Sequence, residues 1–167
     1  MAADQSIILE EYNENWPMVF KAEAARLNQL LSAYVRGSIE HVGSTSVPGL
    51  LAKPTIDIMI GVESLSASQP AINILTANGY CYYPYKPEQM HWFCAPSPEK
   101  RDFHVHLIPF ESDLWNERLR FRDILRSNSK VRNEYAALKR QLMNEDAQDR
   151  ERYTQLKWPF IKKTLSP

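Results

Sequence analysis

Cysteine, net charge and long apolar runs are all scarce in this sequence of 167 residues, and each scarcity excludes a class of protein. Its two cysteines, Cys81 and Cys94, lack a CxxC spacing and lie among apolar residues, which favours two buried thiols over a disulfide. The 20 basic side chains equal the 20 acidic ones, so overall charge gives no support for a nucleic-acid partner. No stretch approaches the roughly 18 apolar residues of a membrane span, and the N-terminus has no signal-peptide pattern. We therefore expect a cytoplasmic protein with no membrane partner.

Apolar periodicity predicts a mixture of strands and helices up to about residue 110 and helices alone after it. The predicted strands are 6–12, 38–42, 55–62, 80–85, 90–96 and 101–110, and the predicted helices are 16–34, 66–79, 113–126, 130–144 and 148–164. This order predicts an α+β fold, a small mixed α/β sheet flanked by helices, and not a doubly wound Rossmann fold, whose GxGxxG motif is absent. The length fits one domain over 1–167, with a sheet-bearing part at about 1–110 and a helical tail at about 111–167.

Two of only 5 glycines fall in the stretch "HVGSTSVPGLLAKPTIDIMI", residues 41–60. Gly43 follows a predicted strand, and Ser44 and Thr45 add hydroxyl groups to a turn whose backbone N–H groups can bind phosphate. Lys53, later in the same stretch, is a candidate to contact the same phosphates with its positive charge. The same residue types also build ordinary tight loops, so a purely structural turn is the alternative.

Asp57 lies in the strand that follows, on the face opposite Ile56, Ile58 and Ile60. A buried carboxylate is unfavourable unless it is paired, hydrogen-bonded or bound to a metal. Mg²⁺ uses one or two carboxylates together with substrate phosphates, so turn, lysine and carboxylate together favour the handling of a nucleoside triphosphate. The alternative is a structural carboxylate that accepts hydrogen bonds from the turn.

The stretch "IEHVGSTSVPGLLAKPTIDIMIGV" resembles the signature of the GrpB family, also called UPF0157, whose members read close to "EHIGSTSVPGLAAKPIIDI". The likeness continues through "HVHLIPF", "LRFRDILRSN", "EYAALKRQL" and "DRERYTQLKWPFI", and so spans roughly residues 8–165. That family is placed in the nucleotidyltransferase superfamily, which implies a polymerase β-like sheet flanked by helices. The resemblance implies that the Gly-Ser turn of this superfamily corresponds to Gly43 and Ser44, and that its strand carboxylate corresponds to Asp57. A second strand acid is missing, because Thr55 and Met59 occupy the two positions where it would stand.

Histidines are candidates for the missing ligand. In "RDFHVHL" the side chains of Asp102, His104 and His106 share one face of a strand. If this strand neighbours that of Asp57, then His104 or His106 completes a site for Mg²⁺ or Mn²⁺, or for Zn²⁺, and serves as ligand or general base. A pair of hydrogen-bonded structural histidines is the alternative, and His41 is a weaker candidate.

The helical tail holds an excess of basic residues, whereas acidic residues are in excess before it. Arg118, Arg122 and Arg126 recur every four residues and therefore form a basic stripe on one helix face. We keep Arg122, Lys139 and Lys157 as candidate phosphate contacts, with solvated helix faces as the alternative.

Three functions follow from these residues. The first is an enzyme, a metal-dependent nucleotidyltransferase that uses a nucleoside triphosphate and a small-molecule or macromolecular acceptor. The second is a non-catalytic module that binds a nucleotide or another anion and lacks the second strand acid. The third is a hydrolase whose metal is held by Asp57, His104 and His106.

Overall fold

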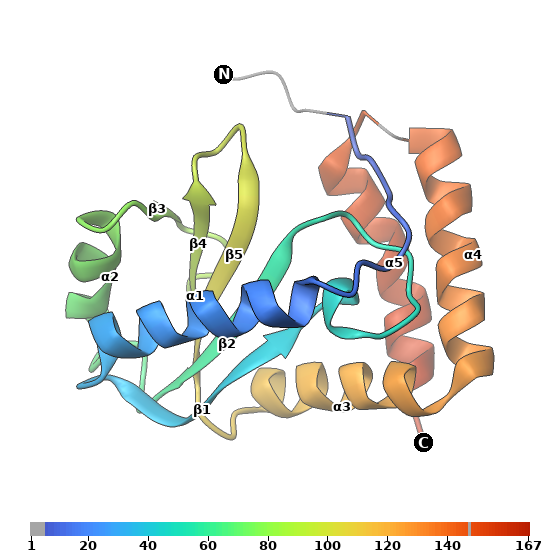
Figure 1. Cartoon of the computed structure of the whole chain (residues 1–167). Coiled ribbons are helices and arrows are strands. Elements are labelled where there is room, and N and C mark those ends of the chain that lie inside the picture. Colours follow the sequence, from blue (N-terminus) through green and yellow to red (C-terminus); the bar gives the residue numbers. More distant parts are fainter. Residues whose placement is uncertain (1–5, 147) are drawn as a thin grey trace.

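The helices and strands follow the predicted order, with one exception at the N-terminus (Figure 1). The computed structural model describes residues 6–146 and 148–167. Its elements are α1 (Trp16–Leu31), β1 (Val35–Val42), the 3-10 turn η1 (Ser44–Ser46), β2 (Ile56–Val62), α2 (Gln69–Thr76), β3 (Cys81–Tyr83), β4 (His91–Pro96), β5 (Arg101–Pro109), α3 (Asp113–Ser127), α4 (Ser129–Asp146) and α5 (Arg150–Leu165).

The predicted strand at 6–12 is wrong. Only Glu10 pairs there, in an isolated antiparallel bridge with Ala52. Ile7 is buried in a cluster with Leu142 of α4 and Tyr153 of α5, so the start of this segment packs on the tail helices. Alternating apolar residues show which side of a segment is buried, but not whether another strand lies beside it.

The five strands form one mixed sheet in the order β1-β2-β5-β4-β3. The pair β2 and β5 is parallel, and the other neighbouring pairs are antiparallel. In the parallel register Asp57 lies opposite His104, and Met59 lies opposite His106. The predicted mixed sheet is thus confirmed, as is the expectation that the Asp57 strand neighbours the histidine strand.

One face of the sheet is apolar and is covered by α1 and α2 (Figure 1). Ile56, Ile58 and Ile60 of β2 pack there with Val105 and Leu107 of β5. Every second residue of β2 is committed to this core because side chains alternate along a strand. Asp57 and Met59 consequently project from the opposite face.

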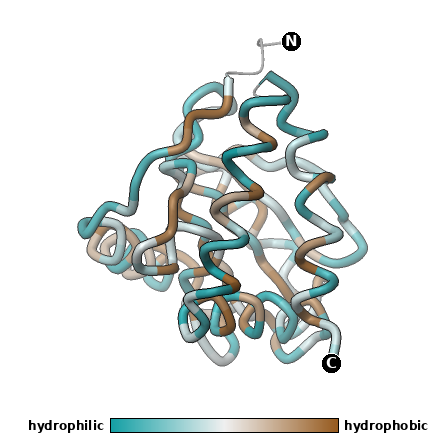
Figure 2. The backbone as a smooth tube through the Cα atoms, turned by 90° about the vertical axis from the view of Figure 1, so that its right-hand side faces the viewer, coloured by the Kyte–Doolittle hydropathy of each residue, from teal (hydrophilic) through white to brown (hydrophobic). Residues whose placement is uncertain are grey.

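The opposite face is bordered by the tail helices α3, α4 and α5. Helix α3 begins where the Ser112 side chain accepts a hydrogen bond from Trp115 N, and α5 begins where Asp149 accepts one from Arg152 N. Polar and apolar stretches alternate along these helices (Figure 2), as expected for helices with one buried side. None of the described helices combines the length and apolarity that crossing a membrane requires.

Candidate functional site

A cavity of about 860 Å³ lies between the polar face of the sheet and the tail helices. With the exception of His41, its lining includes every residue that the sequence singled out as a candidate for catalysis, metal binding or phosphate binding. Those residues are Gly43, Ser44, Thr45, Lys53, Asp57, His104, His106, Arg122, Lys139 and Lys157. The fold therefore brings together residues that lie up to 114 positions apart in the sequence, which periodicity alone does not establish.

Gly43 is the residue that allows the turn to approach Asp57. Its backbone has φ 73° and ψ −177°, a conformation that is almost exclusive to glycine. A Cβ atom built on it would lie 2.3 Å from Asp57 Oδ2. The sequence predicted that this glycine brings backbone close to a phosphate, and the structure adds that it makes room for the carboxylate.

The hydroxyl groups of the turn already have protein partners. Ser44 Oγ accepts a hydrogen bond of 2.9 Å from Lys139 Nζ. Thr45 is 1% exposed, and its Oγ1 donates to Thr55 O at 3.2 Å while lying 2.9 Å from His41 Nε2. Thr45 thus fixes the turn internally, and Ser44 links it to α4.

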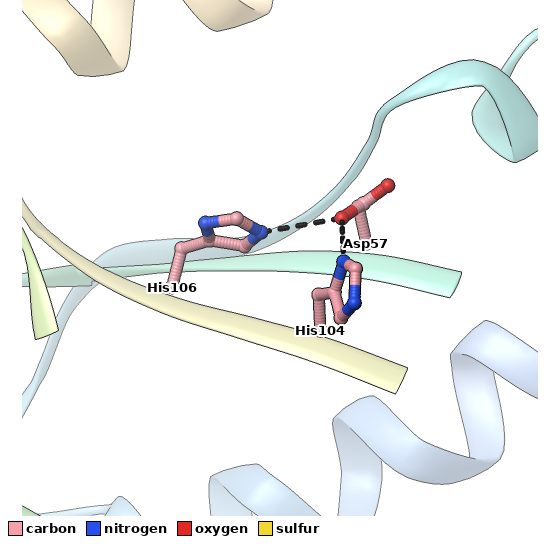
Figure 3. A group of neighbouring side chains, drawn as sticks. All are labelled: Asp57, His104 and His106. Atoms are coloured by element: carbon pink, nitrogen blue, oxygen red, sulfur yellow. Dashed lines mark hydrogen bonds and ion pairs between the residues drawn. The ribbon is translucent and has the colours of Figure 1, made fainter. Parts of the chain in front are cut away.

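Asp57 accepts hydrogen bonds from two histidines through one oxygen. His104 Nδ1 lies 3.2 Å and His106 Nε2 lies 3.3 Å from Asp57 Oδ1, and Figure 3 shows the two rings converging on that atom. Burial would raise the pKa of Asp57, but the hydrogen bonds from His104 and His106 hold it well below its usual value of 3.8. Asp57 is therefore an ionised carboxylate whose Oδ2 faces Gly43.

Arg118 fixes the proton of His106. Its Nη1 donates to His106 Nδ1 at 2.8 Å, and a guanidinium is a donor only. His106 Nδ1 must then be the acceptor, so the ring proton is on Nε2 and points at Asp57. Burial, and then the charge of Arg118, lower the pKa of His106 to about 4, which keeps this ring neutral at physiological pH.

The cluster of Asp57, His104 and His106 fits a metal ion in spacing but not in its hydrogen bonds. Its three ligand atoms lie within 4.8 Å of one another, and the two measured separations are close to the edge of about 3.3 Å expected for tetrahedral Zn²⁺. A metal-bound histidine, however, donates its other N–H to an acceptor. Arg118 offers only donors at that position, so it opposes metal binding through His106 Nε2. Oδ2 of Asp57, which no histidine contacts, is the oxygen that remains for a hard cation.

Three lysines line the cavity on the side of the Gly43 turn. Lys157 and Lys53 approach the Tyr153 ring, with Nζ at 4.7 Å and 5.8 Å from its centroid. Lys139 is 2% exposed and donates to Ser44 Oγ and to the Leu51 carbonyl. Burial, followed by the charges of neighbouring lysines, lowers the pKa of Lys139 to about 6 and that of Lys157 to about 7.

The three arginines of the basic stripe on α3 all donate hydrogen bonds to the sheet or to the turn that follows β1. Arg118 was not among the site residues predicted from the sequence. Arg122 Nη1 donates to Glu40 Oε2 at 2.7 Å and its Nε donates to Asp123 Oδ1 at 2.9 Å, so Arg122 anchors α3 to β1. Arg126 Nε donates to Ser46 O at 2.9 Å. The every-fourth spacing was the signal for this shared role.

His41 does not join the cluster. It lies on the apolar side of the sheet, where its ring stacks on Phe20 at 4.7 Å between centroids. Burial is the main cause that lowers its pKa to about 4. The weaker sequence candidate is thus a neutral structural histidine.

An aromatic wall, formed by Tyr83, Tyr85, Trp92 and Trp158, closes the side of the cavity that β3, β4 and α5 provide. Trp92 lies opposite His106 in the β4–β5 register, and its ring centroid is 5.0 Å from that of His104. Tyr83 and Tyr85 both meet Trp92 edge to face. Sequence reasoning assigned these residues to strands and turns and did not single them out for the site.

Fold and site together define a small α+β protein with a cationic cavity built on one face of a mixed sheet. The chain belongs to the GrpB family, since the family model described as GrpB protein matches residues 6–166. It is 31% identical to the glutamate-rich protein GrpB of Alkalihalophilus pseudofirmus over 96% of this chain and 94% of that protein. A UPF0157 protein of Halalkalibacterium halodurans is 33% identical over 96% of this chain and 81% of its own length.

A solved structure has the same fold. The crystal structure of conserved protein GrpB from Enterococcus faecalis superposes with a TM-score of 0.84 at 33% identity, covering 94% of each chain. The GrpB fold is thereby established for this chain. Membership of the nucleotidyltransferase superfamily stays a prediction from the sequence.

Proposed function

We propose that this chain binds a phosphate-bearing ligand, with a nucleotide as the expected class, in the cavity between the sheet and the tail helices. The observation that carries this proposal is the convergence of Lys53, Lys139 and Lys157 beside the Gly43 turn. The charges of Lys53 and Lys157 lower the pKa of Lys139, and the charge of Lys53 lowers that of Lys157, so these side chains lie close enough to repel one another when protonated. A polyanion in the cavity relieves that repulsion.

Asp57 does not neutralise Lys157. Asp57 already accepts hydrogen bonds from two histidines, and its charge raises the pKa of Lys157 less than burial and Lys53 lower it. Lys139 still donates two hydrogen bonds, as a neutral amine can. Lys157 is only partly buried and therefore has capacity for an anionic ligand.

Titration calorimetry with inorganic triphosphate and with nucleoside triphosphates tests the proposal. We expect Lys157→Met to weaken binding at least tenfold, because a phosphate contact with a cation in a partly buried site is a strong hydrogen bond. Lys163→Met is the matched control, since Lys163 lies on the same helix and is exposed. Absence of binding by the wild type at millimolar concentrations of every one of these anions would contradict the proposal.

Nucleotidyl transfer is the second candidate, and the ionised Asp57 beside the phosphate turn favours it. A hard divalent cation, Mg²⁺ or Mn²⁺, would be held by Asp57 Oδ2 together with ligand phosphates, which suits Mg²⁺. When bound, such an ion neutralises charge that develops on the transferred phosphoryl group. Zn²⁺, and a hydrolase with Asp57, His104 and His106 as ligands, are disfavoured by the Arg118 hydrogen bond.

Release of pyrophosphate from a nucleoside triphosphate, with candidate small-molecule acceptors, separates the two functions. A transferase releases pyrophosphate with Mg²⁺ and loses this activity in Asp57→Asn, whereas a binding module releases none. Asp57→Asn should keep most of its affinity for metal-free inorganic triphosphate, because the lysines supply that binding.

A further inference from the structure

We infer that the aromatic wall is a nucleobase subsite, so that a nucleotide lies across the sheet with its base on Trp92 and its phosphates at the lysines. This inference rests on the proposed binding of a phosphate-bearing ligand and adds its orientation. The aromatic wall comprises Tyr83, Tyr85, Trp92 and Trp158, as defined above.

The sheet fixes the distance between the two ends of the cavity. Asp57 is on β2, and Trp92 is on β4, two strands away in the order β1-β2-β5-β4-β3. Neighbouring strands are about 4.8 Å apart, so Trp92 lies about 10 Å from Asp57 across the sheet and Tyr83, on β3, about 14 Å. A ribose and a short phosphate chain span such a distance. The two histidine rings lie between these ends, on β5.

The aromatic rings on this wall are exposed in a way that core packing does not explain. Tyr83 is 41% exposed and Tyr85 is 44% exposed, although both line a cavity. Both rings contact Trp92 edge to face, at centroid distances of 6.0 Å and 6.2 Å, and the Arg101 guanidinium lies 5.8 Å from the centroid of the Trp92 ring. Clustered exposed apolar surface of this kind marks a binding site, and a planar ring covers it best by stacking.

Lys86 completes the wall with a cation. Its Nζ lies 4.6 Å from the centroid of the Trp158 ring and 5.6 Å from that of Tyr85. The ammonium thereby bridges α5 and the loop after β3 at the aromatic end, far from the Gly43 turn. A lysine donates only, so it can recognise the ring nitrogens and carbonyl oxygens of a base.

Stacking depends on ring area and tolerates different bases, so the subsite should favour purine over pyrimidine nucleotides. Titration calorimetry of the full chain with adenosine triphosphate, cytidine triphosphate and inorganic triphosphate measures the contribution of the base. We expect adenosine triphosphate to bind about tenfold or more tightly than inorganic triphosphate, with cytidine triphosphate between them. Trp92→Leu should remove this advantage and leave the affinity for inorganic triphosphate unchanged.

Tyr83→Leu is a second variant in case Trp92→Leu fails to fold. Its matched control is Tyr82→Leu, because Tyr82 is the preceding residue of β3 and packs on the opposite, apolar side of the sheet. Tyr83→Leu should reduce the advantage of the base, and Tyr82→Leu should not. Tryptophan fluorescence gives an independent readout, since Trp16 and Trp115 are buried and quenching by the base must come from Trp92 or Trp158.

Equal affinity of the wild type for adenosine triphosphate and inorganic triphosphate would overturn the base subsite and leave the phosphate site intact. An equal loss for both ligands in Trp92→Leu would overturn it as well. Binding of adenosine triphosphate without any binding of inorganic triphosphate would instead count against the lysine site and support the aromatic one. Absence of binding by all three ligands would overturn both.

Discussion

Replacing Gly43 by alanine is expected to disturb the site more than any other single methylene-sized change. The backbone conformation at Gly43, with φ 73° and ψ −177°, costs a residue with a Cβ about 1–3 kcal/mol. The new Cβ would also lie 2.3 Å from Asp57 Oδ2, so the carboxylate has to move. Movement weakens hydrogen bonds of 3.2 Å and 3.3 Å to an ionised group, and such bonds contribute about 1.5–3 kcal/mol each.

We therefore expect Gly43→Ala to lower the free energy of unfolding by about 3–4 kcal/mol, which at this chain length is a fall in Tm of about 10 °C. Gly49→Ala is the matched control. Gly49 also has a positive φ, of 81°, but its added Cβ would meet nothing within 4 Å. It should therefore lose only about 1–2 kcal/mol for backbone strain. Urea denaturation monitored by circular dichroism measures both variants.

A double-mutant cycle identifies the carboxylate as the cause. In the background of Asp57→Ala the closest remaining contact of the added Cβ is Asp57 Cβ at 3.0 Å, so Gly43→Ala should cost at least about 1 kcal/mol less there. Equal costs of Gly43→Ala and Gly49→Ala, or strict additivity in the cycle, would refute the reasoning that Gly43 exists to accommodate Asp57.

Three further predictions concern protons. Because the folded-state pKa values of His41 and His106 are lowered to about 4, the unfolded chain binds these protons first, and each histidine should remove about 3 kcal/mol of stability as the pH falls from about 6.5 to 4. Urea titrations over that range should show the free energy of unfolding falling with pH in the wild type and falling less in His106→Gln. A free energy of unfolding that does not change with pH would contradict this prediction. Lys139 and Lys157 are mostly neutral at about pH 8, so binding of inorganic triphosphate at that pH should be coupled to the uptake of about one proton. Calorimetry in two buffers of different ionisation enthalpy measures this uptake. No uptake would mean that neither amine contacts the anion. Arg118→Met removes the hydrogen-bond donor at His106 Nδ1, so nitrogen NMR should show a mixture of the two neutral tautomers of His106 in place of the Nε2–H form of the wild type. An unchanged spectrum would show that Asp57 alone sets the tautomer.

The fold could be predicted from the sequence wherever one periodicity dominated. The alternation in 55–62 placed Ile58 in the core and Asp57 on the opposite face, and both positions are confirmed. The same alternation failed in 6–12, because Ile7 is buried and Leu9 partly buried by tail helices that are remote in sequence. A local pattern reports burial, whereas strand pairing also requires a neighbour that the pattern does not contain.

The candidate site was predictable in its residues but not in its hydrogen bonds. The parallel pairing of β2 with β5 brings His104 and His106 to Asp57, as the sequence analysis expected for adjacent strands. The direction of the Arg118 hydrogen bond depends on how α3 packs across the sheet, and no spacing in the sequence encodes it. Trp92 was missed for a related reason, since a tryptophan in a strand is more often core, and the cavity that it lines is completed by tail helices remote in sequence.

The two faces of the sheet divide stability from binding. The face under α1 and α2 holds a buried apolar cluster beside the neutral His41, and this cluster stabilises the fold without help from the cavity. The other face holds His106 and Lys139 in buried positions and Asp57 and Arg118 in partly buried ones, and burial opposes the charged form of each. Such groups reduce stability unless their partners offset the cost, and proteins tolerate that loss where a site requires it. Lys157→Met should consequently unfold at a higher temperature than the wild type near neutral pH while it binds phosphate more weakly, because it removes an amine whose protonated form is disfavoured in the fold. A gain in stability coupled to a loss of affinity identifies a binding residue, since a residue kept for the fold alone would lose stability when replaced.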